Sequence, residues 1–145
     1  MTSAESGVIE MKVPCEPRFL SVVRLTVAGA AARAGLGVAE ADDVKVAVSE
    51  ACTNAIDHAF PGEPDLGSKT IQLRLFPKEG ELRIEVEDEG VGFDPKRLPK
   101  TQAEDPTQQE GGLGLFLMRG LMDEVKIESA PGSGTKVILV KHPAR

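Results

Sequence analysis

The sequence contains no Trp, no Tyr and only five Phe. It also lacks a basic excess, because 17 Lys and Arg stand against 23 Asp and Glu, which gives a formal net charge of −6. Proteins that bind nucleic acids carry a basic surface, and those that bind single strands add aromatic rings for base stacking. These two absences exclude direct nucleic-acid binding as the expected function.

Cysteines and long apolar runs are scarce as well. Cys15 and Cys52 are the only cysteines, and they form neither a C-x-x-C motif nor a metal-like spacing with His, so we expect two buried thiols. No run approaches the roughly 20 apolar residues of a membrane span, and residues 1–10 do not resemble a secretory signal. We therefore expect no membrane contact and a cytoplasmic location.

The length of 145 residues and the 41% hydrophobic content fit one globular domain. We expect a flexible N-terminal tail over residues 1–7 and a single domain over residues 8–142. Alternation of apolar and polar residues predicts five strands, at residues 8–13, 71–76, 82–86, 125–129 and 136–141. The second and third of these form a hairpin.

Apolar residues at spacings of three and four predict helices over residues 17–34, about 40–59 and 115–122. Asp42 and Asp43 are expected in the first turn of the second helix, where the helix dipole favours carboxylates. A long polar loop rich in Gly and Pro separates residues 89 and 114. The element order predicts an α+β fold, a two-layer sandwich with helices on one face of a mixed, mostly antiparallel sheet.

Three segments are candidates for chemistry. On the second helix, Glu50, Asn54 and Asp57 share one face. This face has two readings, a solvated polar surface or an acid that handles a proton beside an amide oxygen suited to a hard cation. His58 follows directly, and a structural hydrogen bond is the more common role for a histidine near a helix end.

The second segment, Asp88-Glu89-Gly90-Val91-Gly92, follows a predicted strand, and its glycines permit close approach of the backbone to a ligand. Taken alone, this motif more often marks a turn after a hairpin than a ligand site. The third segment is the glycine cluster at residues 111–114, which opens a helix and so offers free N–H groups to an anion. It is neither a P-loop nor a Rossmann fingerprint.

In combination and in this order, the segments resemble a known superfamily. They are SEACTNAIDHAF at residues 49–60, EDEGVGFDP at residues 87–95 and GGLGLFLMRGLMDEV at residues 111–125, with SGTKVIL at residues 133–139 as the closing strand. The chain resembles the GHKL, or Bergerat-fold, ATPases. Within that superfamily it is similar to the small bacterial anti-sigma-factor serine kinases of the RsbW and SpoIIAB type.

The resemblance implies a role for each matching residue. Glu50 corresponds to the general base and Asn54 to the magnesium ligand, while Asp88 corresponds to the acid that recognises the adenine amino group. Residues of about 94–111 correspond to the ATP lid, in which residues 101–110 contain no Lys or Arg. Members of the family often carry a basic lid residue that reaches the phosphates. Because residues 101–110 contain none, the candidates for this contact are Lys100, Arg97 and Arg119. The implied ATP-binding residues are Asn54, Asp57, His58, Asp88, Gly90, Gly92, Gly111, Gly112, Leu113, Gly114, Leu115 and Thr135.

The resemblance further implies a function. It is that of an ATP- and Mg²⁺-dependent serine kinase that sequesters a sigma factor and phosphorylates a STAS-type anti-anti-sigma protein. Such proteins usually form homodimers through the sheet and first helix. Two alternatives remain open. The first is a regulator that binds ATP and a partner without phosphoryl transfer. The second, disfavoured because no phospho-accepting helical hairpin is present, is the catalytic domain of a histidine kinase.

Overall fold

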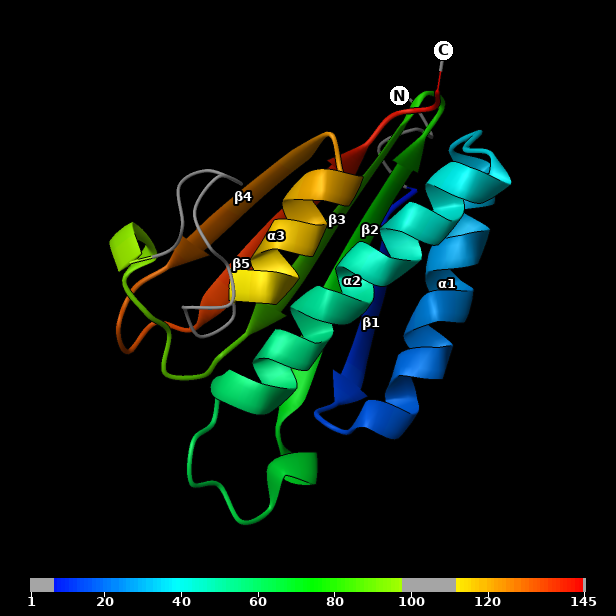
Figure 1. Cartoon of the computed structure of the whole chain (residues 1–145). Helices are drawn as coiled ribbons and strands as arrows, with labels where there is room; N and C mark the ends of the chain where they lie inside the picture. The colour runs from blue at the N-terminus through cyan, green and yellow to red at the C-terminus, as the bar shows by residue number, and fades with distance from the viewer. Residues whose placement is uncertain (1–6, 98–111, 145) are drawn as a thin grey trace.

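A sheet and a layer of helices on one of its faces make up the molecule (Figure 1). The computed structural model describes residues 7–97 and 112–144. The sheet has five strands in the order β1-β2-β3-β5-β4, and all four ladders of the described chain are antiparallel. The predicted two-layer α+β sandwich is therefore confirmed. The predicted tail falls largely on residues 1–6, outside the described residues, as do residues 98–111 of the predicted lid.

The strands form where the sequence alternates. They are β1 at Ile9–Pro14, β2 at Thr70–Lys78, β3 at Glu81–Asp88, β4 at Glu124–Ser129 and β5 at Thr135–Lys141. On β3 every second side chain, at Leu82, Ile84, Val86 and Asp88, is buried on the face of the sheet under the helices. Gly80 makes the turn of the β2–β3 hairpin with a φ of +87°, a conformation that side chains rarely adopt. The alternation thus correctly predicted all the strands to within about two residues at their ends.

The helical layer consists of α1 at Leu20–Arg33, α2 at Val38–His58 and α3 at Gly112–Leu121. A short 3₁₀ turn, Pro17–Phe19, precedes α1. Gly35, with a φ of +82°, ends α1 in a Schellman arrangement in which its N–H donates to Ala32 and that of Leu36 donates to Ala31. Figure 1 shows α2 running across the middle of the layer, between α1 and α3.

The start of α2 differs from the prediction. The helix begins at Val38 rather than near residue 40, so Asp42 and Asp43 lie beyond the first turn. The acidic residue of that turn is Glu40, whose carboxylate accepts a hydrogen bond of 2.8 Å from the N–H of Gly37. This bond satisfies an amide that would otherwise lack a helical partner, which is why the helix starts where it does.

The core lies between the sheet and the three helices, with α2 at its centre. The helix contributes small and β-branched side chains, which let its backbone lie close to the strands. Cys15 and Cys52 belong to this core as free, buried thiols, as predicted, and burial raises the pKa of Cys52 to about 12. The fully buried strand residues opposite the helices are Ile71, Leu73, Leu75, Leu82, Ile84 and Leu139.

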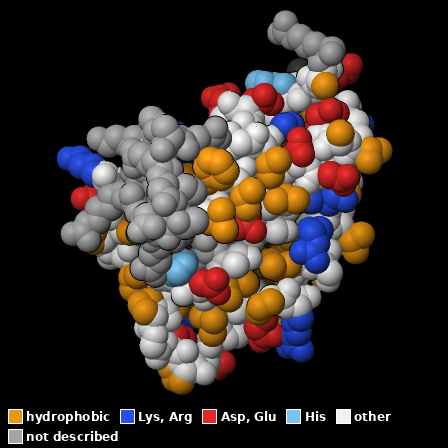
Figure 2. All heavy atoms as spheres, viewed as in Figure 1, with side chains coloured by type: hydrophobic (Ala, Val, Ile, Leu, Met, Phe, Trp, Pro, Cys, Tyr) orange, Lys and Arg blue, Asp and Glu red, His pale blue; other side chains and the backbone are white. Residues whose placement is uncertain are grey.

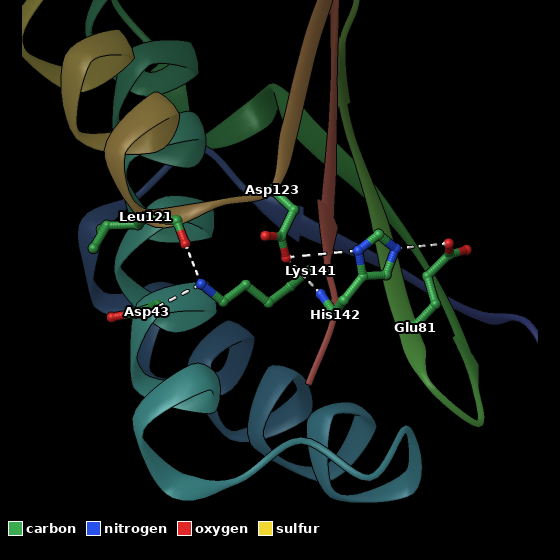
Figure 3. A network of polar contacts seen from close by, with 6 residues as sticks. All are labelled: Asp43, Glu81, Leu121, Asp123, Lys141 and His142. Atoms are coloured by element: carbon green, nitrogen blue, oxygen red, sulfur yellow. Dashed lines mark hydrogen bonds and ion pairs between the residues drawn. The ribbon is translucent and has the colours of Figure 1, made fainter. Parts of the chain in front are cut away.

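A lysine at the end of β5 ties the two layers together (Figure 3). The Nζ of Lys141 donates a 2.5 Å hydrogen bond to the carbonyl oxygen of Leu121 at the end of α3, and lies 3.3 Å from the carboxylate of Asp43 on α2. Only 13% of the Lys141 side chain is exposed. Next to it, the backbone N–H of His142 donates to Asp123 and its ring lies 3.2 Å from Glu81. The ammonium group of Lys141 therefore fixes the positions of α3 and α2 relative to β5.

We expect Lys141→Ala to lower the free energy of unfolding by about 1–3 kcal/mol, because it leaves a helix-end carbonyl and a carboxylate without their partner. Chemical denaturation measures this effect. The matched control is Lys126→Ala, which removes an ion pair to Glu128 whose side chains are 70% and 49% exposed and should change stability by less than about 0.5 kcal/mol. Equal effects of the two substitutions would contradict the role of Lys141.

Candidate functional site

Glu50 and Asn54 meet the first turn of α3. Both side chains are half-buried on α2, one helical turn apart. A Cβ placed on Gly114 would lie 3.2 Å from Oε1 of Glu50 and 3.2 Å from Nδ2 of Asn54. Any side chain at this position would press on the two polar groups, so glycine lets the α3 backbone lie this close without displacing them. The structure thus joins the first and third predicted segments into one cluster, consisting of Glu50, Asn54 and Gly114.

The two leucines on either side of Gly114 differ in exposure. Gly112 is the first residue of α3, and Gly111 lies outside the described residues. Leu113 is 54% exposed, whereas Leu115 is buried in the core. Since the side chain of Leu115 anchors α3 to the core, only its backbone is available to a ligand.

Asp57 and His58 end α2, and both are exposed. Asp57 follows Asn54 by three residues and therefore extends the same helix face. The backbone leaves α2 at Ala59, whose carbonyl oxygen accepts a 2.8 Å hydrogen bond from the N–H of Val91. The end of α2 is thereby attached to the loop that follows β3.

Asp88 places a carboxylate in the buried layer at the end of β3. Its side chain is 8% exposed, and Oδ1 accepts a 2.8 Å hydrogen bond from the N–H of Gly90. Burial raises the pKa of Asp88 above its usual range, while hydrogen bonds from the backbone of Gly90 and Thr135 oppose the rise and the charge of Glu87 adds to it. A buried carboxylate with spare lone pairs is a strong acceptor for an N–H donor.

The glycines around Asp88 allow three segments to touch. A Cβ on Gly90 would collide with the backbone of Ala59, and one on Gly92, which has a φ of +65°, would collide with the carbonyl of Ala130. Gly134, with a φ of +72°, lies against the carbonyl of Asp88 in the same way. The N–H of Gly132 completes the contact with a 2.6 Å hydrogen bond to the carbonyl of Val91.

Three polar residues lie in one row across the sheet. Asp88 on β3 pairs with Thr135 on β5, and Thr135 pairs with Ser129 on β4. Register partners present their side chains to the same face, which here is the face under the helices. Asp88 and Thr135 are among the residues predicted from the sequence, whereas Ser129 is not. The sequence feature that could have identified Ser129 is the alternation of Val125, Ile127 and Ser129 along β4, which directs all three side chains inward.

Together these contacts build a site with two parts. The α2–α3 part combines a carboxylate, an amide oxygen and a helix start, a set suited to proton transfer and to a hard cation with an anionic ligand. The sheet part combines a buried carboxylate with hydroxyl groups, a set suited to a planar polar ligand with an N–H donor. Within the described residues, no group of three or more His, Cys, Asp or Glu side chains is suited to hold a metal ion.

We expect Asp88→Asn to change how stability depends on pH. Because the pKa of Asp88 is raised, the folded chain holds this proton more tightly than the unfolded chain does. The contribution of Asp88 to the free energy of unfolding therefore falls as the pH rises from the usual value of 3.8 through the raised pKa. The stability of the variant minus that of the unmodified protein should rise over this interval. Denaturation across a pH series measures it, and parallel curves would contradict the burial of an ionisable Asp88.

Two helical glycines, Gly29 and Gly114, should respond differently to replacement by Ala. Ala stabilises an exposed helix interior over Gly by about 0.5–1 kcal/mol, and we expect this gain from Gly29→Ala on α1, where a Cβ meets nothing within 4 Å. At Gly114 the new methyl group would press on Glu50 and Asn54, so Gly114→Ala should show no gain or a loss. Urea denaturation of both variants tests this. An equal gain at both positions would show that α3 does not need this glycine.

Comparison with known proteins shows which family has this sequence pattern. A family model described as a histidine kinase-like ATPase domain matches residues 13–141. The serine-protein kinase RsbW of Bacillus pumilus is 43% identical over 139 residues, which cover 92% of this chain and 84% of the relative. RsbW of Bacillus subtilis is 42% identical over 140 residues with the same coverage. RsbW of Listeria innocua is 38% identical over 140 residues, covering 92% and 86%.

Solved structures agree on the fold. The RsbU and RsbW domains of a Mycobacterium tuberculosis protein match with a TM-score of 0.67 at 20% identity, over 95% of this chain and 33% of that longer chain. A blue-light activated histidine kinase domain from Erythrobacter litoralis matches with a TM-score of 0.55 at 24% identity, over 89% of this chain and 61% of that one.

The matched span runs from the end of β1 to the end of β5, and it includes the Glu50–Asn54–Gly114 cluster and the Asp88 row. With sequence identity near 40% over most of both chains, the likeness extends beyond the fold. This chain belongs to the RsbW family of serine-protein kinases, which is built on a histidine kinase-like ATPase domain.

Proposed function

We propose that this protein is an anti-sigma factor that uses ATP and Mg²⁺ to phosphorylate a serine of a STAS-type anti-anti-sigma protein. The observation that carries the proposal is the Glu50–Asn54–Gly114 cluster, in a chain that belongs to the RsbW kinases. Phosphoryl transfer requires an activated hydroxyl, a neutralised phosphate and a fixed geometry, and the parts of the cluster match these requirements.

Asp88 and Thr135 are proposed to bind the adenine. The carboxylate of Asp88 is held in place by the N–H of Gly90 and lies in the buried layer, so it can accept an N–H from the exocyclic amine of the base. Gly90 and Gly92 keep the loop after β3 free of side chains at the points where the backbone passes closest to its neighbours.

Asn54 and the start of α3 are proposed to hold the phosphate end. The amide oxygen of Asn54 is an acceptable Mg²⁺ ligand, and phosphates with water would fill the remaining positions. When bound, Mg²⁺ supplies positive charge that neutralises the phosphates. Gly112, Gly114 and their neighbours in the first turn of α3 offer backbone N–H groups to the same charge. Residues of about 94–111 are proposed as the ATP lid.

Glu50 is proposed as the general base. A serine hydroxyl is a weak nucleophile until a base accepts its proton, and Glu50 is a carboxylate beside both Asn54 and the start of α3. A protein that only binds ATP has no need of this carboxylate. Its presence favours the kinase over a regulator that binds ATP without phosphoryl transfer.

The surface around Glu50 suits a protein acceptor. Figure 2 shows apolar side chains gathered over α3 and the middle of α2. Val46, one turn before Glu50, is 45% exposed, and Leu113 and Phe116 on α3 are 54% and 36% exposed. A contiguous exposed apolar patch with polar residues at its rim is typical of protein-binding surfaces.

Exchange of protein partners would regulate this activity. The protein would sequester its sigma factor until unphosphorylated anti-anti-sigma protein competes for it, and would work as a homodimer in the cytoplasm, where transcription takes place. Among the described residues, no helix combines the length and the apolar character that crossing a membrane requires.

The test is transfer from γ-labelled ATP to a cognate STAS-type protein, compared between the unmodified chain and Glu50→Gln. We expect the substitution to reduce labelling of the acceptor serine by about 10²–10⁴-fold, the usual contribution of a general base, with little loss of ATP affinity. Glu128→Gln is the control, because Glu128 is exposed on β4 and points away from the helices.

Three outcomes separate the possibilities. Full transfer by Glu50→Gln would remove Glu50 from the role of base. ATP binding by the unmodified chain without labelling of any STAS-type protein would favour the regulator that does not transfer phosphate. Failure to bind a sigma factor in a pull-down with ATP would contradict the anti-sigma function.

A further inference from the structure

Ser129, at the last position of β4, has a complete set of hydrogen bonds. Its hydroxyl donates to the carbonyl oxygen of Gly134 at 2.9 Å and accepts from the backbone N–H of Phe93 at 3.0 Å. Its Oγ also lies 2.9 Å from Oγ1 of Thr135. The residue thereby connects the loop after β3, the β4–β5 turn and the row that contains Asp88.

The direction of the bond between the two hydroxyl groups follows from counting protons. A hydroxyl has one proton to donate and two lone pairs. The proton of Ser129 is used on Gly134, since a carbonyl oxygen can only accept. In the 2.9 Å contact Thr135 must therefore donate and Ser129 must accept. The hydroxyl oxygen of Thr135 is left with lone pairs alone for any other neighbour.

We propose that Ser129 is a positioning residue that holds the Thr135 hydroxyl as an acceptor and so favours a 6-amino purine over a 6-oxo purine. The proposal rests on the proposed binding of ATP beside Asp88. Thr135 pairs with Asp88 across the ladder, and their side chains share a face. The amine of adenine carries two N–H donors for these two acceptors, whereas the 6-oxo group of hypoxanthine or guanine presents lone pairs to both.

This role differs from a purely structural one in what its loss changes. A structural clamp at Phe93 and Gly134 would, when removed, weaken all purine nucleotides to the same extent. Removal of the acceptor for the Thr135 proton instead frees that proton to point at the base. A 6-oxo purine then gains a donor and a 6-amino purine loses an acceptor, so the ratio of the two affinities changes.

The experiment measures Kd for ATP and for inosine triphosphate, which has the 6-oxo group without the 2-amino group of guanine. We expect Ser129→Ala to lower the preference for ATP by about three- to tenfold, the worth of one neutral hydrogen bond. Ser129→Cys keeps the size of the side chain with a weaker acceptor and should change the ratio in the same direction. Ser133→Ala is the control, since Ser133 is exposed in the same turn and bonds through its backbone N–H.

Thr135→Val supplies a second test, because Ser129 acts through the Thr135 hydroxyl. In that background, Ser129→Ala should leave the ratio of the two affinities unchanged. Equal weakening of both nucleotides by Ser129→Ala and Ser129→Cys, or an unchanged ratio, would overturn the proposal while ATP binding stands. Absence of ATP binding by the unmodified chain would instead contradict the proposed function, and this role of Ser129 with it.

Discussion

The burial of the Asp88 carboxylate is the constraint on which the arrangement of the loop after β3, the end of α2 and the β4–β5 turn depends. A buried carboxylate must receive hydrogen bonds, and Gly90 and Thr135 supply them from the backbone. To bring those groups near, the loop after β3 lies against the end of α2 and the β4–β5 turn closes over it, which the glycines permit. Burial nevertheless raises the pKa of Asp88, because these hydrogen bonds offset the loss of solvation only in part.

The second organising feature is α2, which contributes one face to the core and the adjoining face to the candidate site. One face carries Ala47, Val48 and Ala51 into the core, where small side chains let the helix lie close to the sheet. The adjoining edge carries Glu50 and Asn54 to the start of α3. At the other end of α3, Lys141 joins its last turn to α2 and β5 (Figure 3). The short helix α3 is therefore held at both ends, and its first turn is presented to the site in a defined position.

Much of the fold was predictable from the sequence, because the periodicity of apolar residues indicates which side chains are buried. Alternation predicted the strands, and spacings of three and four predicted the helices. The cluster of Glu50 with Asn54 was predictable from their spacing on one helix. The start of α2 was mispredicted, because two adjacent acids at Asp42 and Asp43 suggested a first turn, whereas the bond from Gly37 to Glu40 sets it. Ser129 was missed because a serine before a turn is ordinary, and its partners lie in segments separated along the chain.

The sequence by itself determined the elements, their order and the residue types that carry the chemistry, since these depend on interactions between residues close along the chain. The tertiary structure alone decided that Gly114 lies against Glu50 and Asn54, that Asp88, Thr135 and Ser129 form one row, and that the hydroxyl groups of Thr135 and Ser129 are partners. These relations depend on strand register and on close approach between helices. Register is fixed only when β3, β5 and β4 pair, and a proton's direction is fixed only when every acceptor around it is in place.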